Sequence, residues 1–504
     1  LRFVTAASLF DGHDVSINIM RRLLQSKGVE VIHLGHNRSA LDVVNACLHE
    51  DVQAVAISSY QGGHNEYFAY VRELLDKAGA QDVKIFGGGG GVITPSEIKE
   101  LHKKGITRIY SPEDGMKLGL PGIIEDMIER ANYSTIEKID FKKLEKNKSL
   151  DFYNASKVIT YIEDMGTNPF SFETKNTPVL GITGTGGAGK SSLIDELLLR
   201  FHLYFPNFKV ALVSVDPTRK KTKGALLGDR IRLGSAGHPN FYIRSLATRN
   251  SHTELSPGIS KVVSFLKSQS FDLIIVETSG IGQASDEITK VADRCAYVMT
   301  PEYGAQTQLE KIEMIDAADF IVINKFEKPR SEDALRDVRK QYRRNHNIFE
   351  GHEGSPLNDE LPVFGTMASQ FNDSGVNALF EHILKSFDFD VSKIEAVNKN
   401  KDPEVKSKII GPERTLYLRD IASTLRSYNK RALENAKKLG DLNALEKANE
   451  LLPDNEDIQK AVIKKKKEIH PAVFKTIDLF DRTIEQFKKG EFSYKVRGKE
   501  IKVK

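Results

Sequence analysis

The feature that most constrains the fold is a glycine-rich stretch that separates an apolar run from a periodic apolar segment. Residues 184–191 read G-x-x-x-x-G-K-S, the spacing of a phosphate-binding loop between a strand and a helix. Backbone N–H groups of such a loop converge on phosphate oxygens at the positive end of a helix. The loop residues expected to contact a nucleotide are Gly184, Gly187, Ala188, Gly189, Lys190, Ser191 and Ser192.

Two side chains of this loop carry its chemistry. Lys190 would reach the terminal phosphates, and the hydroxyl of Ser191 would ligate Mg²⁺. The alternative is a glycine-rich turn with an incidental lysine. The strand pattern before the loop and the helix pattern after it favour an α/β fold of the P-loop type.

The composition is that of an ordinary globular protein with several domains. The chain has 504 residues, of which 40% are hydrophobic and 28% charged. A net charge of +4 gives no electrostatic reason to expect a nucleic acid or a membrane as partner. Two cysteines, Cys47 and Cys295, and the lack of a secretory start favour the cytoplasm. Because Leu1 already lies in a strand-like run, we expect the chain to be a fragment.

Residues 1–131 alternate strand-like and helical patterns five times. The strand patterns cover residues 2–9, 29–34, 53–59, 83–86 and 106–110. This alternation predicts a parallel, flavodoxin-like (Rossmann-type) sheet, which binds ligands at the carboxyl ends of its strands. The residues expected at those ends are Asp11 and His13 after the first strand, Ser58 and Ser59 after the third, and Gly88 and Gly89 after the fourth.

The first of these loops suggests a metal ligand. A histidine two residues after an aspartate can donate one ring N–H to the carboxylate and keep its other nitrogen for a metal. The alternative for His13 is a surface histidine held by Asp11. Five consecutive glycines at 87–91 leave space for a bulky flat group, which favours the ligand site.

These loops resemble the D-x-H-x-x-G, S-x-L and G-G signature of the cobalamin-binding domain of acyl-CoA and amino-acid mutases. The sequence has Ser16 where the signature has glycine, and Tyr60 where leucine is usual. The resemblance implies that His13 is the lower axial ligand of cobalt in adenosylcobalamin and that Asp11 supports it. It also implies that Ser58 or Ser59, with Gly88 and Gly89, holds the nucleotide tail of the cofactor.

Residues 132–177 show little periodicity and are predicted to be a linker, with a short helix at 136–146. From 178 to 390 the strand–helix alternation resumes. Strand patterns at 209–215 and 271–276 end in Asp216 and in Glu277-Thr278. Acidic residues at strand tips beside a phosphate loop hold magnesium and its water shell. Asp229 lies in a further segment with the character of a switch, and ordinary solvated acids are the alternative for all of these carboxylates.

The base of the nucleotide is indicated by Asn324, Lys325 and Glu327, which resemble the N-K-x-D guanine clamp of GTPases. A carboxylate there accepts from guanine N1–H and its amino group, whereas adenine presents an acceptor and leaves the carboxylate unpaired. Because Glu327 replaces the usual aspartate, ATP stays an alternative to GTP. The loop at 364–368 is expected to face the base.

Motifs at 215–218, 227–230, 244–249 and 277–283 together resemble the metallochaperone GTPases that serve cobalamin-dependent acyl-CoA mutases. That resemblance covers residues 178 to about 387. With the phosphate-loop chemistry, it implies magnesium ligands at Ser191, Asp216, Asp229, Glu277 and Thr278, a nucleotide contact at Arg232, and catalytic roles for Lys190, Asp229 and Glu277.

Residues 391–504 are predicted to be a helical linker, with long helices at 413–452 and 457–488 that need a partner for their apolar stripes. The whole chain resembles the amino-terminal half of the fused isobutyryl-CoA mutase family. The resemblance implies a Mg²⁺-dependent GTPase that gates cofactor loading, a homodimer, and isomerase activity only with an absent mutase barrel. A methylmalonyl-CoA mutase-type protein, a non-catalytic cobalamin module with a structural nucleotide site, and a P-loop ATPase or kinase are the alternatives.

Overall fold

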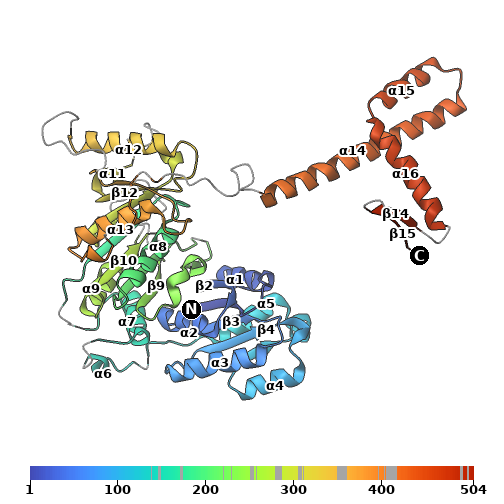
Figure 1. The fold of residues 1–504 in the computed structure, drawn as a ribbon. Helices are drawn as coiled ribbons and strands as arrows, with labels where there is room; N and C mark the ends of the chain where they lie inside the picture. Colours follow the sequence, from blue (N-terminus) through green and yellow to red (C-terminus); the bar gives the residue numbers. More distant parts are fainter. Residues whose placement is uncertain are drawn as a thin grey trace. The chain divides into compact units, whose positions relative to one another are not determined.

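Figure 1 shows a computed structural model of the chain, which forms two compact units, residues 1–405 and 406–504. The structure describes all residues except 138, 146–148, 171–173, 220, 229, 250–254, 257, 279–286, 305–308, 310–311, 349–359, 395–396, 402, 404–416, 489–491, 497–498 and 504.

The first sheet contains the five strands predicted for residues 1–131, in the order β5-β4-β3-β1-β2, and all of its pairings are parallel. Its strands are β1 (Arg2–Ser8), β2 (Glu30–Arg38), β3 (Ala54–Ser58), β4 (Lys84–Gly88) and β5 (Arg108–Tyr110). One face packs on α1 (Val15–Ser26) and α5 (Pro112–Arg130), and the other on α2 (Ala40–Glu50), α3 (His64–Lys77) and α4 (Pro95–Lys103). The flavodoxin-like fold is confirmed.

Local sequence signals set where three of these helices begin. Capping boxes form at α2 between Ser39 and Asp42, at α4 between Thr94 and Glu97, and at α5 between Ser111 and Asp114. In each box the hydroxyl accepts from a backbone N–H of the first turn, and the carboxylate accepts from the capping residue. The helices therefore start just past the strand ends, where the ligand-facing loops lie.

The second sheet has seven parallel strands in the order β13-β12-β11-β6-β10-β7-β9, with β6 at its centre. The strands are β6 (Val179–Gly184), β7 (Val210–Asp216), β9 (Phe241–Ala247), β10 (Leu273–Glu277), β11 (Arg294–Met299), β12 (Phe320–Asn324) and β13 (Val363–Thr366). One face packs on α8 (Lys190–Tyr204) and α13 (Ser374–Ser386). The other packs on α7 (Phe152–Met165), α9 (Ile259–Ser268) and α12 (Ser331–Asn345), with α11 (Met314–Ala317) beside α12.

Two elements between the sheets were not predicted. Helix α7 lies inside the expected linker, but its buried residues belong to the core of the second sheet. Helix α6 (Phe141–Glu145) is shorter than the helix predicted at 136–146. Strand β8 (Ala225–Leu227) follows β7 in the sequence and yet pairs with β2, so it extends the first sheet. The two sheets are therefore joined by backbone pairing.

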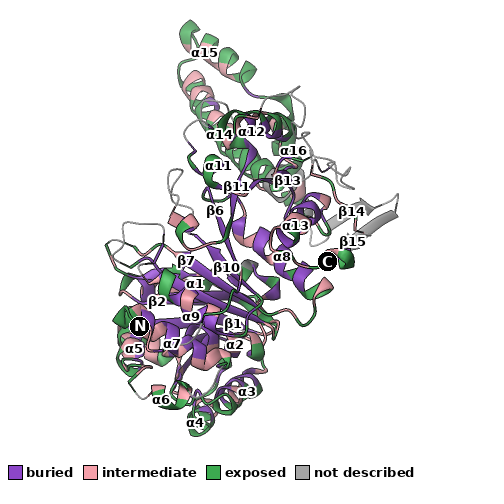
Figure 2. Cartoon of the chain, turned by 90° about the vertical axis from the view of Figure 1, so that its left-hand side faces the viewer, coloured by how far each residue is buried: buried purple, intermediate pink, exposed green. Residues whose placement is uncertain are grey.

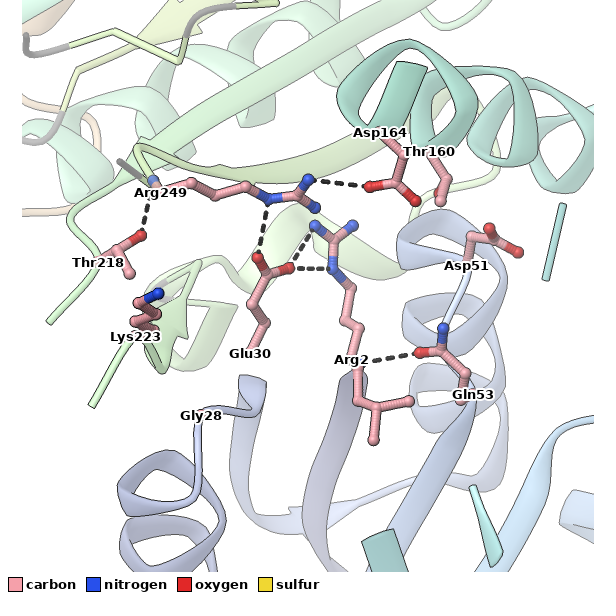
Figure 3. A pocket seen from close by; sticks show the side chains of 11 residues that line it. Arg2, Gly28, Glu30, Asp51, Gln53, Thr160, Asp164, Thr218, Lys223 and Arg249 are labelled. Carbon is pink, nitrogen blue, oxygen red and sulfur yellow. Dashed lines mark hydrogen bonds and ion pairs between the residues drawn. The ribbon is translucent and has the colours of Figure 1, made fainter. Parts of the chain in front are cut away.

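Ion pairs also join the sheets, as Figure 3 shows. Glu30 on β2 accepts from Arg2 Nη2 at 2.8 Å and from Arg249 Nε at 3.2 Å. Burial alone would raise the pKa of Glu30, but Arg2 and Arg249 lower it to about 2. Glu163 on α7, which packs on the second sheet, pairs with Arg2 Nη2 of β1 at 3.3 Å. Charges from the two domains thus neutralise one another where the domains meet.

The second unit comprises α14 (Tyr417–Leu451), α15 (Glu456–Lys467), α16 (Pro471–Lys488) and an antiparallel hairpin of β14 (Phe492–Val496) and β15 (Lys499–Val503). The single helix predicted at 457–488 is wrong, because it is two helices. Proline has no N–H to donate in a helix interior, and Pro471 instead begins α16. Figure 2 shows α15 as mostly exposed, whereas the strands of the large sheets are buried. Among the described helices, none is long and apolar enough to cross a bilayer.

Candidate functional sites

Asp11 and His13 lie in the loop after β1, at the carboxyl edge of the first sheet. Asp11 is buried, and its Oδ1 accepts from the backbone N–H of His13 and from His13 Nδ1, each at 2.9 Å. Its Oδ2 accepts from the backbone N–H of Tyr60 at 2.6 Å. Because Nδ1 donates to a carboxylate, Nε2 keeps its lone pair. The His13 side chain is 75% exposed, so a metal can approach it from outside.

An apolar cavity of about 260 Å³ lies in the same part of the sheet. Its walls come from the ends of β3 and β4 and from helices α1 and α5. Tyr60 belongs to the cavity and also contacts the His13 ring, with ring centroids 5.5 Å apart. Leu120 and Met127 close the side formed by α5. Such a slot suits a flat apolar ring better than a charged ligand.

The predicted serines and glycines divide in their roles. Ser58, Gly88 and Gly89 line the cavity, and Ser58 Oγ is buried without a partner among the described residues. Ser59 instead accepts a bond from Ser8 Oγ at 2.9 Å, and both hydroxyls are buried. A Cβ at Gly89 would lie 2.0 Å from the carbonyl oxygen of Ser59, so only glycine lets these two loops meet. The unpaired hydroxyl of Ser58 can bond a polar atom of a ligand.

The phosphate loop connects β6 to α8, as predicted. Lys190 is buried, and its Nζ donates to the carbonyl oxygens of Gly184 at 3.1 Å and of Thr185 at 3.3 Å. The ammonium group therefore already lies inside the loop. Ser191 Oγ donates to Glu277 Oε1 at 2.8 Å, so the sheet brings these two predicted magnesium ligands together.

The other predicted magnesium ligands differ in their contacts. Asp216 ends β7, the neighbour of β10, and its Oδ2 accepts from the N–H of Gly228 at 2.6 Å. Thr278 turns its hydroxyl to Thr183 Oγ1 on β6, at 2.8 Å. Asp229, the side chain of Arg232 and residues 279–286 lie outside what the structure describes.

No group of three His, Cys, Asp or Glu side chains gathers to hold a metal in the described part of the chain. Ser191 and Glu277 are the two predicted Mg²⁺ ligands that contact each other directly. Mg²⁺ in nucleotide sites usually binds carboxylates together with phosphate oxygens.

The predicted base clamp meets the phosphate loop directly. Asn324 is buried, and its Nδ2 donates to the carbonyl oxygen of Ala188 at 2.8 Å. Lys325 Nζ donates to the carbonyl oxygen of Gly187 at 2.8 Å. Gly189 has φ +92°, and Ser192 is half-buried in the first turn of α8. The strand end at β12 and the loop after β6 thus form one continuous surface for a nucleotide.

Glu327 follows the clamp and has an unusual environment. Its Oε2 is buried and has no hydrogen-bond partner among the described residues. A buried carboxylate oxygen without a donor is unfavourable unless a ligand supplies one. Guanine offers two N–H donors, and either would satisfy the unpaired oxygen of Glu327 if the base were bound here.

Two contacts at these sites were not predicted. Tyr60 joins Asp11 and His13 to the cavity, and Ser214 Oγ donates to Glu277 Oε2 at 3.0 Å. Ser214 lies two residues before Asp216 on β7, so both side chains point to the same side of the sheet. That strand alternation was the available signal for Ser214. For Tyr60 the signal was its place in the S-x-L signature, which gave no contact with His13.

Comparison with known families agrees with both sites. Residues 1–113 match the family model described as B12 binding domain, and residues 167–411 match the Methylmalonyl Co-A mutase-associated GTPase MeaB. The chain combines a B12-binding domain with a GTPase domain of the MeaB family. The two resemblances drawn from sequence motifs, to a cobalamin-binding domain and to a chaperone-type GTPase, are therefore confirmed.

Curated relatives extend this similarity to the whole chain. The fused isobutyryl-CoA mutase of Geobacillus kaustophilus (strain HTA426) is 48% identical over 99% of this chain and 48% of its own length. That of Cupriavidus metallidurans (strain ATCC 43123 / DSM 2839 / NBRC 102507 / CH34) is 43% identical over 100% of this chain and 47% of its own length. The chain therefore spans about half the length of the curated relatives it matches.

Among solved structures, the LAO/AO transport system kinase covers 68% of this chain and 91% of its own. Its TM-score of 0.30 and identity of 19% are too low to support an argument.

Proposed function

We propose that this chain binds adenosylcobalamin and hydrolyses GTP as part of a fused acyl-CoA mutase. GTP hydrolysis gates the loading and protection of the cofactor. The observation that carries this proposal is the pairing of a carboxylate-held, exposed histidine with an apolar cavity in a chain that also contains a phosphate loop. The order of the two domain families, B12-binding and then MeaB, supports it.

In the cobalamin site, His13 would hold cobalt through Nε2, while Asp11 fixes the tautomer of the ring. The corrin cofactor supplies cobalt–carbon bond chemistry when bound, and the histidine tunes it. Ser58 Oγ would bond a polar atom of the nucleotide tail, and the cavity lined by Gly88, Gly89 and α5 would hold its ring system. The site fits the cofactor because its orphaned hydroxyl, glycine slot and free ring nitrogen each match a different part of it.

In the nucleotide site, Lys190 and the loop N–H groups stabilise the charge of the transferred phosphoryl group. Ser191, Glu277 and Asp216 hold Mg²⁺, with Thr278 and Asp229 completing the set, and Mg²⁺ neutralises phosphate charge when bound. Gly184, Gly187, Ala188, Gly189 and Ser192 cradle the phosphates, Arg232 contacts the nucleotide, and Asn324, Lys325 and Glu327 select guanine.

The complete protein would carry the isomerase activity. The curated relatives are named fused isobutyryl-CoA mutases. The proposed reaction of the complete protein is the rearrangement of isobutyryl-CoA to n-butyryl-CoA, in which a mutase domain outside this chain would bind the acyl-CoA. We further propose a homodimer that works in the cytoplasm. Helices α14–α16 would lead to the mutase domain.

The cobalamin part is tested with the wild-type chain and with His13→Ala, by absorbance spectroscopy of adenosylcobalamin and by electron paramagnetic resonance spectroscopy of the paramagnetic Co(II) form of cobalamin. His36→Ala removes another exposed histidine of the same sheet and serves as the matched control. We expect a histidine-bound cofactor spectrum with the wild type and the control only. The same spectrum with His13→Ala would contradict the assigned ligand.

The GTPase part is tested by phosphate release from GTP with Mg²⁺ present and absent. Turnover well above background that needs Mg²⁺ is expected, together with a strong preference for GTP over ATP. Background turnover would favour a cobalamin module with a structural nucleotide site, and a preference for ATP would favour a P-loop ATPase or kinase.

A further inference from the structure

Strand β8 belongs to the nucleotide-binding half of the sequence but pairs with the first sheet. Its register places Ala225 opposite Glu30 and Leu227 opposite Ile32 on β2. Strand β8 is only three residues long, and it begins nine residues after Asp216 at the end of β7. The described residues from Asp216 to Arg230, named here the bridging segment, therefore start at the nucleotide site and pass along the cobalamin-binding domain.

The far end of the bridging segment returns to the nucleotide site. The N–H of Gly228, the residue after β8, donates to Asp216 Oδ2 at 2.6 Å. Gly228 has φ +56°, and a Cβ there would lie 2.4 Å from Ser245 Oγ on β9. The carboxylate of Asp216 is thus held by a residue whose own position is set by close contact with Ser245.

One buried carboxylate of the cobalamin-binding domain fixes this arrangement. Glu50, the last residue of α2, is fully buried. It accepts from Arg230 Nη2 at 2.6 Å, from Ser245 Oγ at 2.9 Å and from the N–H of Ser245 at 3.1 Å. Arg230 Nη2 also donates to the carbonyl oxygen of Ile243 at 2.6 Å. A buried charge pair held this tightly is strongly destabilised when one partner is removed.

A second buried carboxylate at the same interface allows the role of Glu50 to be isolated. Glu163 on α7 is 2% exposed and pairs with Arg2, Arg244 and Arg249. Arg249 contacts the bridging segment through its backbone N–H, which donates to Thr218 Oγ1 at 2.8 Å, and Arg2 also pairs with Glu50 at 3.9 Å. Glu163 itself bonds the guanidinium groups of these arginines and not Arg230 or Ser245, the two residues through which Glu50 acts. It therefore holds the two domains together as Glu50 does, but without the contacts that position Gly228.

We infer that Glu50 is a positioning residue for the nucleotide site: through Arg230 and Ser245 it holds the bridging segment so that Asp216 is placed to bind Mg²⁺. The inference rests on the proposed GTPase function. It adds that a residue of the cobalamin-binding domain helps to hold a Mg²⁺ ligand in the position that GTP hydrolysis needs. Arg230 acts as the second half of the same contact.

The experiment compares the full chain with its Glu50→Gln and Glu163→Gln variants. Phosphate release gives kcat and KM for GTP, and the fluorescence of bound methylanthraniloyl-GDP titrated with Mg²⁺ gives the Mg²⁺ midpoint. For Glu50→Gln we expect kcat to fall about tenfold and the Mg²⁺ midpoint to rise about tenfold, the size of one lost charged hydrogen bond. KM for GTP should stay within about twofold of the wild type, since the phosphate loop and base clamp are unchanged.

The control variant separates positioning from simple stability. Glu163→Gln should lower the thermal unfolding midpoint but leave kcat and the Mg²⁺ midpoint unchanged. Equal kcat and Mg²⁺ midpoints in the two variants would overturn the inference, because Glu50 would then only hold the domains together. If Glu50→Gln does not fold, Arg230→Lys, which keeps a charged donor, should retain most of the kcat that Arg230→Gln loses. Equal kcat values for Arg230→Lys and Arg230→Gln would also overturn the inference.

Failure of the proposed function is a separate result. If the wild-type chain releases no phosphate from GTP, the proposed GTPase activity is rejected. The Mg²⁺ titration of bound methylanthraniloyl-GDP would still decide on Glu50, since it requires binding and no turnover.

Discussion

The two ligand sites of this chain differ in how they are prepared. In the cobalamin site, the His13 side chain is 75% exposed and stands at the edge of a cavity. In the nucleotide site, Lys190 and Glu277 are each 8% exposed and Asn324 is 2% exposed. The cobalamin site therefore presents an exposed ligand atom, whereas these three side chains of the nucleotide site are buried and already hydrogen-bonded to a neighbouring side chain or to the phosphate loop.

This difference has an energetic consequence. Cobalamin would add bonds to Nε2 of His13 and to Ser58 Oγ without breaking a hydrogen bond of either atom. A nucleotide would replace bonds that Lys190 makes to carbonyl oxygens of the phosphate loop. Phosphate oxygens are charged acceptors and so bind this ammonium group more strongly than carbonyls do. The nucleotide site is thus held together by weaker bonds that its ligand replaces.

The largest expected effect is at Lys190. In Lys190→Ala, the charge that stabilises the phosphoryl group is lost, and we expect kcat for GTP to fall by about 10²–10³. Cobalamin binding should keep its wild-type spectrum and affinity, because the two sites share no side chain. Phosphate release and cofactor titration test the two halves of this prediction, and a parallel loss of cobalamin binding would show that the sites are not independent.

The next effect concerns the choice of base. In Glu327→Gln, the buried acceptor becomes an amide that can also donate, so the preference for GTP over ATP should fall by about a hundredfold. Competition between GTP and ATP, measured as the ratio of kcat/KM, tests this. Glu332→Gln, an exposed glutamate of α12, should leave the ratio unchanged. An unchanged ratio in Glu327→Gln as well would remove the role assigned to the orphaned carboxylate.

A smaller effect is expected beside the cobalt ligand. Asp11→Asn keeps the shape of the side chain but weakens the hold on His13 Nδ1, and second-sphere changes of this kind cost about 10- to 100-fold in affinity. Titration of adenosylcobalamin followed by absorbance measures the change. Asp14→Asn, three residues along the same loop, is the matched control and should bind like the wild type. If both variants bind alike, Asp11 has no role in presenting the histidine.

Much of this architecture could be predicted because its signals are local. The spacing of the phosphate loop and the acidic strand tips led directly to Ser191 and Glu277, and the structure joins these two by a hydrogen bond. The alternation of strands and helices in residues 1–131 gave the flavodoxin-like sheet. Each of these inferences uses residues within one or two turns of one another, where periodicity and loop chemistry act.

The contacts between the two domains could not be predicted in the same way. Glu50 bonds Arg230, which lies 180 residues further along the chain, and nothing near either residue marks the pairing. Strand β8 is three residues long, too short for a periodic pattern, and its partner is a strand of the other sheet. Helix α7 has a clear apolar face, but it follows a segment of little periodicity and was included in the linker. Such long-range pairings depend on the assembled fold.

The smallest effect is expected from pH, and it concerns the cobalamin-binding domain. His33 on β2 is buried, and its Nδ1 shares a hydrogen bond with Thr5 Oγ1 at 2.9 Å. Burial, aided by the charge of Arg21, lowers the pKa of His33 from 6.5 to about 4. The unfolded chain therefore takes up this proton at a higher pH than the folded chain does. The stability that His33 contributes is complete above pH 6.5 and is lost as the pH falls towards 4.

The urea midpoint of unfolding, measured between pH 7.5 and 4.5, tests this prediction about His33. We expect the wild-type midpoint to fall across that range, by an amount that corresponds to up to about 3 kcal/mol from this residue. His33→Asn carries no titrating ring, so its midpoint should fall less steeply even if it starts lower. Parallel curves for the two proteins would assign the acid sensitivity to other groups. A flatter curve for the variant would assign the acid sensitivity to His33 on β2. Because the bridging segment pairs with β2, mild acid would then destabilise the cobalamin-binding domain where it contacts the GTPase domain.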